Sequence, residues 1–139
     1  MAEVFAVGAC YTNEEIVATL GGETQNYVRF VTGKRVVALC LNAWDHPRAP
    51  TEVWVGTGGL RDRVGRSAQW LVDQCAAEPD QGTPLFIKEV AARGGERTWR
   101  YHGRYRVVGD TQDEGALEAV REQRKAPVVR ILYLERVSD

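Results

Sequence analysis

The stretch R-T-W-R-Y-H-G-R-Y-R-V-V, residues 97–108, decides the fold that this sequence predicts. Aromatic or apolar residues alternate in it with basic ones, and successive side chains of a β-strand point to opposite faces of the sheet. We therefore predict a strand with one aromatic face and one cationic face. The aromatic face would carry Trp99, Tyr101, Tyr105 and Val107, and the cationic face Arg100, His102, Arg104 and Arg106.

A strand of this kind has two interpretations. Phosphates attract cations and an unstacked base needs a flat apolar surface, so the two faces suit a nucleic acid. Alternatively, the rings belong to the hydrophobic core and the arginines form a solvated face. Gly103 interrupts the strand at a position where glycine packs nothing and costs stability. It predicts a β-bulge or a close approach of another backbone.

Composition places the chain among single-domain globular proteins, because 139 residues with 44% hydrophobic content can bury one core. The net charge of −1 argues against a protein that coats polyanions without selectivity. The charge is nevertheless uneven: residues 93–106 hold five arginines against one glutamate, and residues 110–125 hold five carboxylates. Positive charge confined to one segment is expected of a protein that binds a short footprint.

The three cysteines predict neither a disulfide framework nor a metal site, since their number is odd and no C-x-x-C spacing occurs. The N-terminal residues lack the basic start and long apolar run of a signal peptide. No segment approaches the roughly 18 apolar residues of a membrane span. We expect a cytoplasmic protein with thiols in the reduced state, without cofactor, metal or membrane contact.

The remaining elements follow from periodicity and capping signals. A helix should begin at Thr12 or Asn13 and end at Gly21 and Gly22. The expected strands are residues 4–9, 34–42, 52–55, 84–90 and 128–137, with the apolar run 34–42 in the centre of the sheet. Further helices are expected over residues 60–77 and from a capping box at residues 111–114 to about residue 125.

Between these elements we predict a polar link at residues 23–26, loops at residues 43–50 and 79–84, and a connecting tip at residues 91–96. The order of elements indicates an α+β domain spanning residues 1–139. Its sheet would curl toward a small β-barrel with two or three flanking helices.

The loop at residues 43–50 is the second candidate for function. It follows the buried central strand, and loops at such positions commonly carry sites. Trp44, Asp45, His46 and Arg48 bring an indole, a carboxylate, an imidazole and a guanidinium into five positions. Trp54 and Trp70, in contrast, are expected in the core, and His46 and His102 are expected to make surface hydrogen bonds.

Several motifs resemble the SRA-type and wider PUA-like modules that bacteria fuse to HNH nucleases, or carry alone, to detect modified DNA. They are G-G-E-T-Q-N-Y (21–27), E-V-W-V-G-T-G-G (52–59), A-Q-W-L-V-D-Q (68–74), P-L-F-I-K (84–88) and W-R-Y-H-G-R-Y-R-V (99–107). Together they span most of the chain in the order found in those modules. The sequence departs from them at residues 56–62, which read G-T-G-G-L-R-D instead of G-E-G-x-x-G-D.

This resemblance implies a PUA/SRA-like reader that rotates a modified cytosine, foremost 5-methylcytosine, out of double-stranded DNA and stacks it between aromatic rings. The candidate walls of the base pocket are Trp44, Trp99, Tyr101 and Tyr27. Asp45 would accept a hydrogen bond from the cytosine amino group. The candidate phosphate ligands are Arg48, Arg61, Arg63, Arg100 and Arg104, two of which begin a predicted helix where an anion would be favoured. A nuclease partner would act in trans.

Two other functions are compatible with parts of the sequence. A related PUA-like module of the ASCH or YTH kind would bind RNA or a modified nucleoside through the same rings, and the 2′-hydroxyl would distinguish the two. A small hydrolase would need a nucleophile with a base, or a metal. The sequence contains no Ser-His-Asp arrangement, no H-E-x-x-H and no paired carboxylates in an apolar context, so we predict a protein without catalytic residues.

Overall fold

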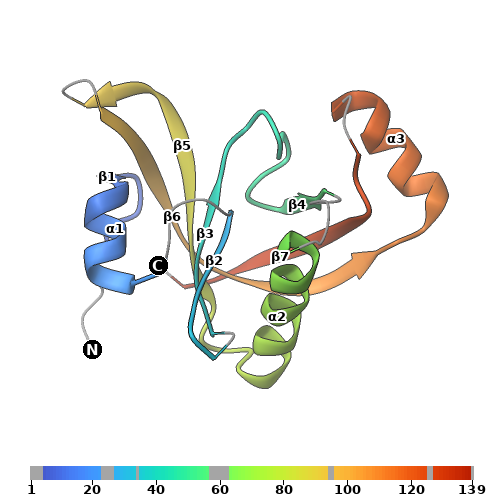
Figure 1. Cartoon of the computed structure of the whole chain (residues 1–139), viewed down its shortest axis with the longest axis horizontal. Coiled ribbons are helices and arrows are strands. Elements are labelled where there is room, and N and C mark those ends of the chain that lie inside the picture. The colour runs from blue at the N-terminus through green and yellow to red at the C-terminus, as the bar shows by residue number, and fades with distance from the viewer. Residues whose placement is uncertain are drawn as a thin grey trace.

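A computed structural model describes residues 5–22, 27–33, 35–56, 63–93, 96–124 and 127–138. Its strands are β1 (Cys10–Thr12), β2 (Val28–Val31), β3 (Arg35–Leu41), β4 (Glu52–Val55), β5 (Thr83–Arg93), β6 (Glu96–Thr111) and β7 (Arg130–Ser138). Its helices are α1 (Asn13–Leu20), α2 (Arg63–Ala77) and α3 (Glu114–Arg124). The predicted α+β class with a curled sheet and flanking helices is confirmed (Figure 1).

The sheet is mixed and strongly curved. Over the described residues it has seven strands, in the order β2-β3-β5-β6-β7-β4, and β1 joins it by pairing with β6. Strand β3 lies parallel to β5 and antiparallel to β2, as expected for a strand buried on both faces. Strands β5 and β6 form a long curved hairpin that extends past α1 at one end of the molecule, while α3 lies at the other end (Figure 1).

Each helix covers its own hydrophobic cluster. Helix α2 packs through Ala68 and Leu71 on the face of β3 that carries Leu39 and Leu41. Helix α1 contributes Ile16 to a second cluster on the opposite face. Helix α3 packs on a third cluster around Trp54, which is fully buried as predicted. Trp70 is only partly buried and contacts Phe30 edge to face, with ring centroids 4.8 Å apart.

Helix α1 follows the sequence signals closely. The Thr12 hydroxyl accepts a hydrogen bond from the Glu15 amide, and the Glu15 carboxylate accepts one from the Thr12 amide, which together form a capping box. Gly21 ends the helix with a φ of 82°. At α3 the capping prediction was wrong by two residues, because Asp113 and not Thr111 accepts the hydrogen bond from the amide of Ala116.

Other predicted boundaries also need correction. Residues 5–9 form no strand, and the first strand is β1. Strand β2 was missed, because its sequence V-R-F-V follows a polar segment and contains a charge. Strands β5 and β6 run to Arg93 and from Glu96, so the connection is shorter than the predicted tip at residues 91–96. The predicted link at residues 23–26 and the first residues of the helix predicted over 60–77 lie outside the described residues.

Gly103 marks both a bulge and a close backbone approach, so that prediction is confirmed. In the β5–β6 pair Leu85 lies opposite Gly103 and Phe86 lies opposite Tyr101, which leaves His102 as the extra residue of β6. Gly103 has a φ of 111°, and a Cβ there would lie 2.9 Å from the backbone oxygen of Ser138. The bulge therefore requires glycine.

The bulge changes which face each side chain occupies, and the predicted two-faced strand was wrong. Trp99 and Tyr101 lie in the cluster under α1, whereas Tyr105 lies in the cluster under α2. Arg100 lies opposite Ile87 and Arg104 opposite Pro84, which are on different faces of β5. One inserted residue reverses the alternation for the rest of a strand. The aromatic and cationic sets are thus each divided between two faces.

Gly103→Ala is expected to lower the free energy of unfolding by about 2 kcal/mol, because it combines a left-handed backbone with a contact to a backbone oxygen. Urea denaturation followed by circular dichroism would measure the change. Gly109→Ala on the same strand is the control, since a Cβ there meets nothing within 4 Å. Equal stability of the two variants would contradict the assignment of the bulge.

Candidate nucleic-acid interface

The loop after β3 is held in a fixed shape by local hydrogen bonds. The amide of Asp45 donates to Asn42 Oδ1 at 2.7 Å, and Asn42 Nδ2 donates to Asp45 Oδ2 at 3.1 Å. The amide of His46 donates to the carbonyl oxygen of Asn42 at 3.0 Å. Reciprocal side-chain bonds of this kind stabilise a turn without regular structure. Trp44 and Asp45 are therefore presented on an ordered turn at the end of the central strand.

Trp44 is the most exposed of the large hydrophobic side chains among the described residues, at 87%. The flanking Ala43 is exposed as well. Tryptophan is buried in most proteins because its ring is the largest apolar surface of any side chain. Here the ring contributes little to the core and is accessible for stacking.

The buried side chain of His46 links this loop to strand β4. It is 2% exposed, and its Nδ1 accepts a hydrogen bond of 3.1 Å from the amide of Trp54 on β4. Since Nδ1 is an acceptor, the proton of the neutral ring is on Nε2. The imidazole also contacts the half-buried ring of Tyr27, with centroids 4.7 Å apart. The prediction of a surface histidine was wrong, because the loop turns this side chain inward between two strands.

Arg48 provides an accessible cation near the same loop. Its side chain is 53% exposed and its guanidinium lies 3.5 Å from Glu52 Oε2, a loose surface ion pair. The guanidinium carbon also lies 5.8 Å from the centroid of the Trp54 ring. An exposed pair of this geometry contributes little to stability. Arg48 can therefore exchange its partner for a phosphate at small cost.

Tyr101 and Trp99 were predicted to line an open base pocket, and the structure corrects this. Tyr101 is fully buried, with its ring centroid 5.1 Å from that of Phe86 and 5.6 Å from that of Phe5. Trp99 is 9% exposed, and the cations of Arg29 and Lys88 lie 5.3 and 5.8 Å from its ring centroid. Both rings face the cluster under α1 because of their register with β5. Neither is accessible to a base.

The predicted phosphate ligands are only partly available. Arg100 is held by two hydrogen bonds to Glu89, of 3.1 and 3.2 Å, and by one to the carbonyl oxygen of Gly8. Arg104 and Arg35 border a cleft of about 150 Å³ beside Gln74 and Pro84. Arg61 and the side chain of Arg63 lie outside the described residues.

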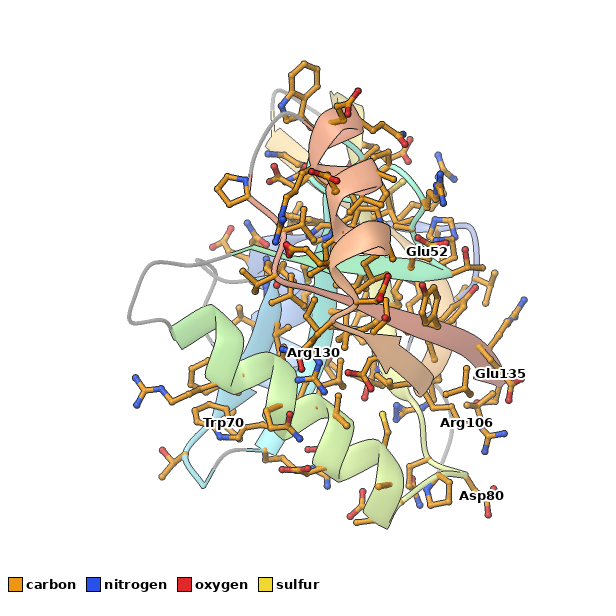
Figure 2. All side chains as sticks on the ribbon, turned by 90° about the vertical axis from the view of Figure 1, so that its right-hand side faces the viewer. Glu52, Trp70, Asp80, Arg106, Arg130 and Glu135 are labelled. Carbon is orange, nitrogen blue, oxygen red and sulfur yellow. The ribbon has the colours of Figure 1, made fainter. Side chains whose placement is uncertain are left out.

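Ion pairs also neutralise arginine side chains in the C-terminal half of β6 and on the neighbouring β7. Arg106 Nη2 lies 2.6 Å from Glu135 Oε1 on β7, and Figure 2 shows the two side chains beside each other. Arg130 pairs with Asp110 at 2.7 Å and also donates to Gln69 of α2. Two of the arginines of the predicted cationic face, Arg100 and Arg106, are therefore held in ion pairs with residues of neighbouring strands. Arg48 is more exposed than Arg100, at 53% against 41%, and its ion pair is longer, at 3.5 Å against 3.1 Å.

Sequence reasoning missed one polar cluster, which consists of Arg29, Asn13, Trp99 and Lys88. Arg29 is 1% exposed although it lies on the strand β2 that the sequence did not predict. No local pattern in V-R-F-V indicated this burial, because Val28 and Phe30 pack in the cluster under α2 and Arg29 points to the other face of the strand.

Near the bulge, the pKa values of His102 and Glu89 are both shifted by their surroundings, which include the Arg100 guanidinium. Burial lowers the pKa of His102 below its ordinary value of 6.5, and the nearby Arg100 guanidinium lowers it further. The hydrogen bond from Arg100 is the main cause that lowers the pKa of Glu89. At neutral pH His102 is therefore uncharged and Glu89 is ionised, so the histidine adds no positive charge to β6.

The stability of the fold is expected to fall as the pH drops below 6.5, the ordinary pKa of histidine. The unfolded chain then takes up a proton that folded His102 resists, and unfolding is favoured. A further loss follows below 4.5 as Glu89 is protonated, since the folded state favours its charged form. Urea denaturation at a series of pH values would measure both steps. His102→Gln should reduce the first step and keep the second; an unchanged first step would contradict the assignment.

No family model, curated protein or solved structure matches this chain. The described part of the chain contains no group of three or more His, Cys, Asp or Glu side chains that could hold a metal ion. None of the helices in the same residues is both long and apolar enough to cross a bilayer.

Proposed function

We propose that this protein is a PUA/SRA-like module that binds double-stranded DNA carrying a modified base, with 5-methylcytosine as the first candidate. The observation that carries the proposal is the exposure of Trp44, at 87%, on a turn fixed by Asn42 and Asp45. The motif resemblance across residues 21–107 and the curled sheet support the same class.

The energy of stacking suits this role. Removing a base from the duplex costs a few kcal/mol, and the cost is lowest at weakened pairs. Stacking on one aromatic ring returns about 1–3 kcal/mol per base. Because the Trp44 turn is already ordered by its hydrogen bonds, little conformational entropy is lost on binding. An exposed ring on an ordered turn can therefore offset much of the cost of displacing a base.

The neighbouring residues of the loop have complementary roles in this proposal. The Asp45 carboxylate can accept a hydrogen bond from the exocyclic amino group of cytosine, since a carboxylate has several acceptor positions. Arg48 contacts a backbone phosphate in place of Glu52. Tyr27 supports the loop through its contact with His46 and does not itself stack on the base. The recognition surface is thus the loop after β3 and excludes Tyr101.

A binding titration over matched duplexes tests this function. The duplexes contain cytosine, 5-methylcytosine, 5-hydroxymethylcytosine, N6-methyladenine or a phosphorothioate, at one fixed salt concentration. We expect a preference of about tenfold or more for one modified duplex, equivalent to about 1.4 kcal/mol. Equal affinity for all duplexes would exclude a reader of modifications.

Two further arms test the alternatives. Tighter binding of a matched RNA would favour an ASCH or YTH type of module, because only RNA offers the 2′-hydroxyl. Cleavage of any substrate during long incubation with magnesium or manganese would show an enzyme. We expect intact DNA in that arm and weaker binding to RNA.

A further inference from the structure

Arg29 is a buried cation with incomplete hydrogen bonding. Its side chain is 1% exposed, and its Nη2 donates to Asn13 Oδ1 at 2.6 Å. Its Nε and Nη1 are buried and have no hydrogen-bond partner among the described residues. The salt bridges of this part of the chain also give it no carboxylate partner. A guanidinium that is removed from water without an acceptor is costly.

The fold places the Arg29 guanidinium close to the aromatic ring of Trp99. Arg29 lies opposite Ala38 on β3, and Cys40 follows on the same face. These two small residues leave room for the long side chain to reach across the sheet. Its guanidinium carbon lies 5.3 Å from the centroid of the Trp99 ring on β6. A cation–π contact stabilises the charge in part but occupies none of the N–H donors.

Two more groups beside Arg29, the indole N–H of Trp99 and the ammonium group of Lys88, are of the kind that binds anions. The indole Nε1 of Trp99 is also buried without a hydrogen-bond partner in the described residues. Lys88 lies opposite Trp99 on β5, and its Nζ is 5.8 Å from the same ring. Helix α1 begins at Asn13, so its positive end faces this cluster. Of the two acidic residues of the first turn, Glu14 and Glu15, Glu15 accepts the hydrogen bond of the capping box.

We propose that Arg29 and the indole N–H of Trp99 bind an oxyanion of the phosphate class. A guanidinium fork matches two phosphate oxygens, and charge-assisted hydrogen bonds are roughly twice as strong as neutral ones. Binding supplies acceptors to three buried donors that otherwise have none among the described residues. This site uses none of Trp44, Asp45 and Arg48, so it goes beyond the proposed reading of a modified base and can be tested without DNA.

Thermal unfolding in inorganic phosphate, with chloride used to keep the ionic strength constant, tests the site. We expect the wild-type Tm to rise by about 4 °C for each tenfold increase in phosphate above its Kd. Arg29→Met replaces the cation with an apolar chain of similar length. It is expected to abolish the phosphate response while leaving the Tm without phosphate equal or higher, since no unpaired buried charge remains.

Arg121→Met is the matched control, because it removes a surface arginine of α3 that pairs with Glu114 at the other end of the molecule from α1 (Figure 1). It should keep the full phosphate response. Trp99→Phe keeps an aromatic ring but removes the pyrrole part of the indole with its N–H, so it remains informative if Arg29→Met fails to fold. We expect it to weaken phosphate binding by about tenfold.

The site would be rejected if wild-type protein showed no response to phosphate beyond that to chloride, or if Arg29→Met and Trp99→Phe both responded like wild type. A competition arm identifies the source of the oxyanion. A short oligonucleotide that displaces phosphate indicates a nucleic-acid phosphodiester, and simultaneous binding indicates a free phosphate. Trp44→Ala should leave the phosphate response intact, which separates this site from the proposed base-reading loop.

Discussion

Tyr101→Ala is expected to lower the free energy of unfolding by about 3–5 kcal/mol, which is the range for truncating a large buried aromatic residue. The ring is fully buried and contacts Phe5 and Phe86, and it closes the cluster between α1 and the sheet. Its removal leaves a cavity in this cluster, to which the segment of Phe5, α1, β3 and β5 also contribute. Chemical denaturation of the purified variant would measure the loss.

This result would distinguish a core residue from a wall of a binding pocket. A pocket residue is accessible, so its truncation would reduce nucleic-acid binding with little loss of stability. Tyr101→Phe is the control, since it preserves the ring and should retain most of the stability. A stable Tyr101→Ala variant with selectively lost binding would show that the burial of this ring has been misassigned.

Trp44→Ala, in contrast to Tyr101→Ala, is expected to reduce nucleic-acid binding without reducing stability. It should weaken binding to the preferred modified duplex by about 1–3 kcal/mol, or roughly fivefold to more than a hundredfold, through the loss of base stacking. Because the ring is 87% exposed, its removal creates no cavity and should leave the free energy of unfolding unchanged. Fluorescence anisotropy with modified and unmodified duplexes would measure the effect.

Val108→Ala is the matched control for this prediction, since Val108 is also an exposed hydrophobic residue, at 54%, on the outer part of β6. It should alter neither binding nor stability. Trp44→Phe should recover part of the affinity because a smaller ring still stacks. Unchanged discrimination in Trp44→Ala would remove the main support for the proposed function, whatever the behaviour of the Arg29 site.

The sequence predicted those features of the fold that depend on neighbouring residues. The helix cap at Thr12, the end of α1 at Gly21 and an interior strand at β3 all follow from short patterns. The loop with Trp44 was also predicted, since its two prolines exclude regular structure. Strand β2 was not predicted, because a short run with one arginine carries too weak a signal.

The candidate site was predicted less completely. The exposed Trp44 and its ordered turn agree with a site in the loop, whereas the burial of Trp99 and Tyr101 does not agree with an open pocket. The predicted cationic strand is instead paired with acidic partners, since Arg100 bonds Glu89 and Arg106 bonds Glu135. These partners are 11 and 29 residues away in the sequence, where no local pattern connects them.

The sequence by itself determined where strands, turns and helix caps form, and that Gly103 is a point of irregularity, because these properties depend on dihedral preferences and on hydrogen bonds between near neighbours. Only the tertiary structure decided which side of the sheet each side chain faces beyond that point. The single extra residue at His102 reverses the alternation, and its effect depends on the pairing of β6 with β5. The burial of Arg29 beside Trp99 arises in the same way, because it requires four strands to bring distant residues onto one face.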